Sequence, residues 1–276
     1  MSQPSQVSQV DRALRAERDH YNRRMKLIVF GAAALAVACS SRSEKAPAAG
    51  APSLEQIVAA PDRAEKDRKI DGSRKPVETL TFFGVKPGMR VADLGAGAGY
   101  TSELLARVVG ASGKVIAHDS PTWDGPGLQK VWQERGAKPV MANTTHVVRA
   151  WEEPLPPGTQ DLDGVYFVCA YHDVIAEKGD SKKLVASVFA GLKHGGVFVV
   201  IDNSAKDGTG GADASTLHRI DEKLVRDEVT AAGFKLEGSG DFLRNPKDAR
   251  DWNADPGSGD ARARTQDRFV LKFVKP

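Results

Sequence analysis

Short apolar runs and amphipathic segments alternate along most of the chain. Continuous apolar runs bounded by turn residues indicate buried strands, and apolar positions at helical spacing indicate helices packed on a core. We expect strands at 90–94, 113–119, 146–150, 163–170, 197–202, 235–242 and 268–274. We expect helices at 100–109, 181–192 and 216–232, with two shorter helical pieces within 54–83.

This alternation predicts the fold class. Strands that alternate with helices at such spacing form a parallel, doubly wound sheet with helices on both faces. The last two strands have no helix between them, which predicts an antiparallel hairpin at one edge and a long loop over 243–267. We therefore expect residues 54–276 to form one α/β domain with a Rossmann-like, doubly wound, mostly parallel seven-stranded sheet and an antiparallel edge hairpin.

The first 53 residues have a different pattern. Residues 1–24 are polar without apolar periodicity, which indicates a disordered segment or an extension upstream of a start at Met25. Residues 25–39 have a basic start, an apolar run (LIVFGAAALAVA) and a small-residue ending, as a signal peptide does. The apolar run is shorter than the roughly 20 residues that a membrane span needs.

The end of this segment, LAVACS, resembles a bacterial lipobox, in which Cys39 is lipidated. The match is imperfect, because Ala36 stands where a large aliphatic residue is usual. The alternatives are an ordinary secretory signal and an uncleaved anchor. Residues 40–53 are rich in Ser, Ala, Pro and Gly and predict a flexible linker. We expect a lipoprotein of the bacterial cell envelope that faces the periplasm, with the cytoplasm as the alternative location.

Composition narrows the choice of partners. The 276 residues carry a net charge of +3 without a strongly basic block, so nucleic acid is not an expected partner. The chain has two cysteines, and no combination of Cys, His and carboxylate residues has the spacing of a metal site. We expect no metal. Cys169 is expected in the core, and His146 and His194 are expected to be structural.

A glycine-rich turn, GAGAG at 95–99, follows the first predicted strand and opens a helix. Glycines let the backbone approach a ligand closely, and a helix N-terminus offers free N–H groups, so this unit predicts an adenosine-cofactor site. A dinucleotide fingerprint, G-x-G-x-x-G, needs its third glycine at position 100, where the chain has Tyr100.

The pattern present is Asp93-x-Gly95-x-Gly97-x-Gly99. It resembles motif I of class I S-adenosylmethionine-dependent methyltransferases. The resemblance implies that these residues bind S-adenosylmethionine, with the loop admitting its methionine and ribose edge. It also implies that Asp93 orients the cationic methionine end.

Further features occur in the order of this family. Asp119 ends the second predicted strand, where the family uses an acidic residue to accept both ribose hydroxyls, a task that suits a carboxylate. Trp151 and Glu152 follow the third strand, where the family often places adenine contacts. The turn KHGGV at 193–197 resembles the family's L-x-P-G-G turn, with His in place of Pro.

The resemblance covers about residues 70–275. Four strings, RKPVETLTFFGVKPGMRVADLGAG, YHD, LHRID and DRFVLKF, are similar to those of a poorly characterised bacterial group of predicted methyltransferases with a lipoprotein-like signal. The chain lacks the N/D-P-P-Y motif of enzymes that methylate nucleic-acid amino groups, which again disfavours nucleic acid as a substrate.

Candidate catalytic residues follow the fourth predicted strand. In open α/β sheets the ligand lies beyond the carboxyl ends of the strands. Tyr171, His172 and Asp173 stand there, where other methyltransferases carry substrate-facing residues. We expect His172 to act as a general base, Asp173 to fix its tautomer or position, and Tyr171 to contact substrate. The alternative is that YHD only begins a loop or caps the next helix.

Other substrate-binding candidates follow the fifth strand. Asn203 precedes a glycine-rich stretch at 207–211, which is either a mobile lid or a flexible surface loop. His218 and Arg219 stand near the start of the next predicted helix, either to bind an acidic substrate group or to face solvent.

These expectations combine into an S-adenosylmethionine-dependent methyltransferase that acts on a small-molecule substrate. The alternative is a non-catalytic, nucleoside-ligand-binding module of the cell envelope on the same fold, because a fold by itself does not prove an activity. Export would leave the supply of S-adenosylmethionine unexplained, since it is made in the cytoplasm.

Overall fold

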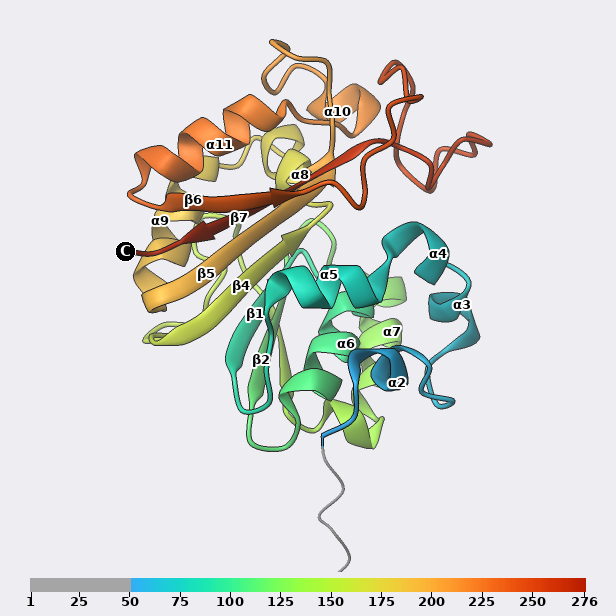
Figure 1. Cartoon of the computed structure of the whole chain (residues 1–276), viewed down its shortest axis with the longest axis vertical. Coiled ribbons are helices and arrows are strands. Elements are labelled where there is room, and N and C mark those ends of the chain that lie inside the picture. Colours follow the sequence, from blue (N-terminus) through green and yellow to red (C-terminus); the bar gives the residue numbers. More distant parts are fainter. Residues whose placement is uncertain (1–50) are drawn as a thin grey trace, which may run out of the picture. The chain divides into compact units, whose positions relative to one another are not determined.

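A single sheet organises the part of the chain that the computed structural model describes, residues 51–276 (Figure 1). Its seven strands are β1 Arg90–Leu94, β2 Lys114–Asp119, β3 Thr144–Val148, β4 Leu162–Val168, β5 Leu192–Asn203, β6 Lys235–Gly240 and β7 Arg268–Val274. The strand order is β3-β2-β1-β4-β5-β7-β6. Strands β1 to β5 pair in parallel, and β7 pairs antiparallel with both β5 and β6. The predicted fold class and its antiparallel edge pair are confirmed.

Helices cover both faces of this sheet. They are α2 Leu54–Val58, α3 Glu65–Arg68, α4 Asp71–Arg74, α5 Pro76–Phe83, α6 Tyr100–Val109, α7 Pro126–Gly136, α8 Tyr171–Ala176, α9 Ser181–Gly191, α10 Ala214–Leu217 and α11 Glu222–Ala231, with a short 3-10 helix at Pro139–Met141. Figure 1 shows α8, α9 and α11 on one side of the sheet and α5, α6 and α7 on the other. This is the layered arrangement expected of a doubly wound sheet.

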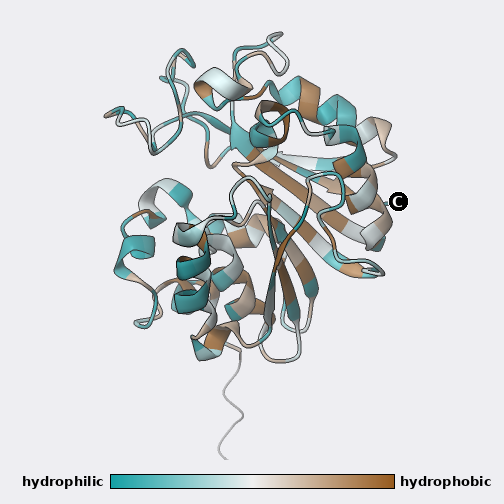
Figure 2. Ribbon diagram, turned by 180° about the vertical axis from the view of Figure 1, so that it is seen from behind, coloured by the Kyte–Doolittle hydropathy of each residue, from teal (hydrophilic) through white to brown (hydrophobic). Residues whose placement is uncertain are grey.

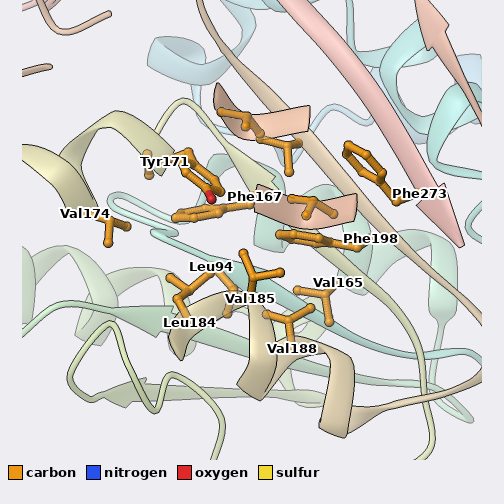
Figure 3. Packing of buried hydrophobic residues seen from close by; sticks show 14 of the residues in the cluster. Leu94, Val165, Phe167, Tyr171, Val174, Leu184, Val185, Val188, Phe198 and Phe273 are labelled. Atoms are coloured by element: carbon orange, nitrogen blue, oxygen red, sulfur yellow. The ribbon is translucent and has the colours of Figure 1, made fainter. Parts of the chain in front are cut away.

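Each face of the sheet has its own apolar core. On the side of α8, α9 and α11, Phe167 and Phe198 pack with Tyr171, Val185 and Val188 (Figure 3). On the side of α2, α5, α6 and α7, Tyr166, Val199 and Ile201 belong to a second cluster. Neighbouring residues of β4 and β5 therefore enter opposite cores, as the alternation of side chains along a strand requires.

The hydropathy of the ribbon reflects this burial. Figure 2 shows apolar residues along the central strands, while polar residues dominate the outward surfaces of the helices and the long loops. Strands that are covered on both faces have continuous apolar sequences, as β4 and β5 do.

The expected helix over 216–232 is wrong, because the structure breaks it between α10 and α11. His218 adopts a left-handed backbone conformation with φ +50°, which ends α10. Arg219 and Ile220 are then fully buried, and Asp221 caps α11 by accepting a hydrogen bond from the backbone N–H of Lys223. Tertiary burial at LHRID thus overrides the local helical spacing.

Smaller differences concern element boundaries. The segment 54–83 forms four short helices rather than two, and Lys75, with a left-handed φ of +44°, separates α4 from α5. The third strand begins and ends two residues before the predicted range of 146–150. The stretch 243–267 has neither a helix nor a strand, as predicted, whereas β6 ends at Gly240, two residues before the predicted end.

The N-terminal predictions concern residues that the structure does not describe. Residues 1–24, the signal-like segment 25–39 with Cys39, and most of the predicted linker 40–53 lie outside the described range. Within residues 51–276, no helix is long and apolar enough to cross a membrane.

Candidate functional site

A cavity of about 460 Å³ opens at the carboxyl edge of the parallel strands. Residues from the ends of β4 and β5, including Cys169 and Asn203, meet residues from α4 and from the approach to β7. Chain order reverses here, because β1 neighbours β2 on one side and β4 on the other. Ligands of open α/β sheets bind at such a switch point. Cys169 was expected in the core, but it is only partly buried and lines this cavity.

The glycine turn crosses the edge of the sheet between β1 and α6. Gly95, Gly97 and Gly99 have φ values of +61°, +52° and +74°, conformations that side chains disfavour. A Cβ atom at position 95 would lie 2.5 Å from the Cβ of Ala170, whereas one at position 97 would meet nothing within 4 Å. The turn is therefore a tight cradle at Gly95 and open at Gly97, a shape that fits the close approach of a cofactor.

Asp93 lies beneath this turn at the end of β1. Its carboxylate is 1% exposed and accepts a hydrogen bond from Ser102 Oγ at 2.5 Å. Burial, helped by the nearby charge of Asp119, raises the pKa of Asp93 to about 7. Asp93 does not line the cavity, so any effect on a ligand passes through the turn above it.

Asp119 joins the glycine turn to the end of β2. Its Oδ1 accepts the backbone N–H of Gly97 at 2.7 Å, and its Oδ2 accepts Trp132 Nε1–H at 3.1 Å and His146 Nε2–H at 2.8 Å. Trp132 also stacks on His146, with ring centroids 4.1 Å apart. These three donors use most of the roughly four acceptor positions of a carboxylate, and Asp119 has no exposed surface. Ribose hydroxyls reach it only when Trp132 or His146 moves aside.

An aromatic cluster lies beside the turn. Trp151 Nε1–H and Trp123 Nε1–H donate to the carboxylate of Glu177 at 2.7 and 2.6 Å. A Cβ atom at Gly95 would lie 3.4 Å from the Trp151 ring, so this ring closes one side of the cradle. Trp123, which sequence reasoning missed, lines the cavity, whereas Trp151 and Glu152 do not.

Glu152 instead stabilises the chain behind the cluster. Its Oε1 accepts the backbone N–H of Asp180 at 2.8 Å, just before α9. The structure thus gathers Gly95, Trp151 and Glu177 around the turn and leaves Glu152 outside that group.

His172 is the most buried polar residue on the cavity wall. It lies in the first turn of α8 and is 3% exposed. Its Nδ1–H donates to Asp202 Oδ1 at 2.7 Å, and its backbone N–H donates to Asp202 Oδ2 at 2.9 Å. The fixed Nδ1 leaves Nε2 on the side of Asp173, whose Oδ1 is 3.4 Å away. Burial alone lowers the pKa of His172, but the charge and hydrogen bond of Asp202 outweigh it and raise the pKa to about 9.

Asp202 is a functional candidate that sequence reasoning missed. Its signal was an acidic residue at the end of an otherwise apolar strand, next to Asn203. Asp202 has no exposed surface, so it positions His172 and does not touch a ligand itself.

The structure also brings Asp173 and His218 to the same wall. Asp173 Oδ1 lies 3.8 Å from His218 Nδ1, and the His172 and His218 rings meet edge to face with centroids 5.4 Å apart. One ligand atom from each of His172, Asp173 and His218 falls within a span of 4.8 Å. This grouping unites residues up to 46 positions apart, which sequence spacing alone did not indicate.

Tyr171 and Arg219 are not brought to the cavity. Tyr171 is fully buried and donates its hydroxyl to Glu228 at 2.6 Å. Arg219 is also fully buried and pairs with Asp248 at 2.9 Å, with further hydrogen bonds to the carbonyl oxygens of Ser204 and Trp252. Both contacts hold the elements behind the cavity together.

Another part of the cavity lining is basic and is called the arginine wall below. Arg74, Arg264, Gln266 and Arg268 line it, and none of these was a candidate from the sequence. The guanidinium of Arg268 donates to the carbonyl oxygen of Ser73, which fastens the start of β7 to α4. The cavity lining therefore includes an arginine wall and, apart from it, His172, His218, Asp173 and Asp255.

Sequence comparison finds similarity to methyltransferases over part of the chain. A family model described as protein-L-isoaspartate(D-aspartate) O-methyltransferase matches residues 65–121, which include β1, the glycine turn and β2. Ubiquinone/menaquinone biosynthesis C-methyltransferase UbiE of Vibrio cholerae is 29% identical over 126 residues, covering 46% of this chain and 45% of that protein. The chain thus spans about half the length of this relative.

Solved structures share the whole fold. A SAM dependent methyltransferase from Aquifex aeolicus superposes with a TM-score of 0.54 at 20% identity, covering 76% of this chain and 97% of the other. An arsenic (III) S-adenosylmethionine methyltransferase from Chlamydomonas reinhardtii gives a TM-score of 0.53 at 17% identity, covering 81% and 73%. Together these comparisons show a stretch of sequence similar to methyltransferases and a fold shared with S-adenosylmethionine-dependent methyltransferases.

Proposed function

We propose that this protein is an S-adenosylmethionine-dependent methyltransferase that acts on a small molecule held in the cavity at the carboxyl edge of the sheet. The observation that carries the proposal is the glycine turn. Three left-handed glycines follow β1, one of them is too close to Ala170 to bear a side chain, and another donates its N–H to the acidic residue that ends β2. This cradle adjoins the cavity through the residues that follow β4.

The residues that would hold the cofactor surround this turn. Gly95, Gly97 and Gly99 would give backbone contacts, with Asp119 and Trp151 at the β2 and β3 side. When bound, S-adenosylmethionine supplies a methyl group on a positively charged sulfur. The protein then contributes mainly by alignment of the acceptor atom, which is worth several kcal/mol in rate.

His172 is proposed as the residue that receives the acceptor's proton. Asp202 holds Nδ1 in its protonated form, so Nε2 is the atom free to take a proton on the cavity side. Asp173 lies beside Nε2 and is proposed to help orient it. Asn203, which ends β5 on the same cavity, is proposed to contact the acceptor, together with His218.

The cofactor assignment is tested by calorimetric titration of the full-length protein with S-adenosylmethionine and with S-adenosylhomocysteine. We expect micromolar binding that Asp119→Asn weakens at least about tenfold, because the substitution removes an anionic acceptor beside the turn. Asp163→Asn is the matched control, since that carboxylate lies at the opposite end of the sheet and pairs with Lys193. If the folded wild-type protein binds neither S-adenosylmethionine nor S-adenosylhomocysteine, the proposal is wrong.

A second function has one observation in its favour. Asp119 is fully buried, with its carboxylate already bonded to Gly97, Trp132 and His146. A fold that had lost its cofactor would keep such a closed arrangement and serve as a non-catalytic module that binds another nucleoside-like ligand. Binding of adenosine with no detectable binding of S-adenosylmethionine would favour this alternative.

The resemblance to the bacterial group with a lipoprotein-like signal bears on where in the cell the protein is found. We propose that residues 25–39 direct export and that Cys39 is lipidated, which would tether the domain to the cell envelope. Labelling with palmitate that Cys39→Ala abolishes would support this location. Recovery of unlabelled wild-type protein in the cytosolic fraction would contradict it and favour a cytoplasmic enzyme.

A further inference from the structure

The arginine wall of the cavity has no carboxylate partner. Arg74, Arg264 and Arg268 all line the cavity, and no ion pair within residues 51–276 involves any of the three. Elsewhere in the same region arginines are paired at short range, as Arg219 is with Asp248 and Arg135 with Glu103. Arg68 and Arg90 also form no ion pair among the described residues, but Arg74, Arg264 and Arg268 line one cavity together.

Arg268 is the most buried of the three arginines. It is 6% exposed, and its Nε is buried without a hydrogen-bond partner in the described part of the chain. A buried cation without a partner raises the free energy of the folded protein, because it has lost its hydration. An anion that binds it offsets this with charge-assisted hydrogen bonds. Its guanidinium donates to the carbonyl oxygen of Ser73, a neutral group, and has no carboxylate partner among the described residues.

The backbone places these groups close together. Arg268 is the antiparallel partner of Asn203, so both side chains lie on the same face of the sheet edge. Arg264, Gln266 and Arg268 alternate along the chain that leads into β7, and all three line the cavity. The bond from Arg268 to Ser73 brings α4, and with it Arg74, to this wall.

Two neutral side chains add unused acceptors. Asn203 Oδ1 and Gln266 Oε1 are buried and accept no hydrogen bond from the residues described. Buried polar atoms are nearly always satisfied in a finished structure, so such atoms at a cavity wall point to a ligand that completes them. A ligand here would carry N–H or O–H donors beside its negative charge.

The histidines and aspartates on the lining raise the question of a metal ion as the occupant. His172, Asp173 and His218 lie close enough to ligate a metal ion. However, three arginines line the same cavity against two aspartates, Asp173 and Asp255, and His172 already forms an ion pair with Asp202. The charges favour an anion at the arginine wall over a metal at the histidine wall.

We propose that the cavity binds a small anionic acceptor, whose carboxylate or phosphate group lies against Arg74, Arg264 and Arg268. Asn203 and Gln266 accept hydrogen bonds from its polar groups, and its nucleophilic atom lies toward His172. This inference rests on the proposed function in one respect only, the description of the anion as the methyl acceptor.

Direct titration of the full-length protein tests the site. Malonate is the probe for carboxylates and inorganic phosphate the probe for phosphates, each measured by calorimetry at low ionic strength. We expect binding of one or both, weakened by added salt because the contacts are charged. The tighter of the two identifies the anionic group. Absence of binding by both would overturn the proposal.

Variants locate the bound anion. Arg264 is exposed, so Arg264→Gln removes its charge without disturbing the core, and we expect about tenfold weaker binding. Arg74→Gln provides a second test on another element. Arg262→Gln is the control, because Arg262 is two residues away but pairs with Asp260 and does not line the cavity. Equal losses in the Arg262 and Arg264 variants would show non-specific screening and contradict the site.

A competition experiment separates the acceptor from the cofactor. The titration is repeated with S-adenosylhomocysteine at saturation. Anion binding that persists supports an acceptor site, whereas displacement would show that the arginines hold the cofactor's own carboxylate and would overturn the substrate assignment. Failure of S-adenosylhomocysteine to bind while the anion still binds would count against the proposed function and leave the anion site intact.

Discussion

Asp202 accepts two hydrogen bonds from His172, one from the imidazole Nδ1–H at 2.7 Å and one from the backbone N–H at 2.9 Å. The carboxylate ends β5 and the histidine begins α8, so this contact joins two elements that are separated by α9 in the chain. It fixes both the position of α8 and the orientation of the ring.

Asp202→Asn is expected to destabilise the fold. The amide replaces one acceptor oxygen with a donor, and Asp202 Oδ1 also accepts the backbone N–H of Asn203 at 2.7 Å. Leaving buried donors unsatisfied costs on the order of 2–3 kcal/mol, which urea unfolding would detect. Asp163→Asn, at the partly exposed pair with Lys193, is the comparison and should cost less than about 1 kcal/mol. Equal losses of unfolding free energy in the two variants would show that the Asp202–His172 contact does not stabilise the fold.

The same contact predicts a dependence of stability on pH. The pKa of His172 is raised to about 9 in the folded protein, against about 6.5 in an unfolded chain. Its contribution is therefore fully present below pH 6.5 and is lost as the pH rises toward 9, with a total on the order of 3 kcal/mol. The groups that act on it are Asp202, Asp173, Asp255 and His218, of which the three carboxylates favour the charged ring.

The measurement is the free energy of unfolding from pH 6 to pH 10, in wild type and in His172→Gln. We expect the wild type to lose stability over this range more steeply than the variant. Parallel curves for the two proteins would contradict the assigned pKa of His172.

The role of His172 as proton acceptor makes a separate kinetic prediction. A histidine with a pKa of about 9 is charged at neutral pH, so only a small fraction is free to take a proton. Once an acceptor is identified, single-turnover methyl transfer should become faster with pH by up to about tenfold per unit between pH 7 and pH 9. A flat profile in this range would remove His172 from the proton transfer.

The glycine turn offers a matched pair of substitutions. Gly95→Ala would place a Cβ atom 2.5 Å from Ala170, within a left-handed backbone. Gly97→Ala has a similar φ but open space around it, so it should cost only the backbone strain of about 1–2 kcal/mol. We expect Gly95→Ala to lower the melting temperature clearly more than Gly97→Ala, and comparable shifts would contradict the tight packing at Gly95.

Arg219 and His218 are adjacent but differ in burial. Arg219→Ala would leave Asp248 as an uncompensated buried charge, at a cost of about 3–5 kcal/mol in unfolding free energy. His218→Ala should change stability by no more than about 0.5 kcal/mol, because the ring is partly exposed on the cavity wall. Urea titrations of both variants check this contrast. A stable Arg219→Ala protein would restore Arg219 as a candidate for ligand binding.

The sequence by itself determined the sheet and the glycine turn. The apolar runs of β4 and β5 are continuous because both faces of these strands are buried, and a glycine at 95 is required by local backbone geometry. Such signals are contained in neighbouring residues, so the pattern along the chain reveals them. His172 could also be predicted as a site residue, because it follows β4 and the apolar run of that strand is evident in the sequence.

Only the tertiary structure decided what surrounds the cavity. Arg74 and Arg268 come from elements 194 positions apart and meet because β7 inserts next to β5 and its first residue bonds to α4. The break at His218 arises from the burial of Arg219 against Asp248, which no helical spacing encodes. Pairing of charges and burial of side chains depend on which elements become neighbours, and that is fixed by packing of the whole domain rather than by local sequence.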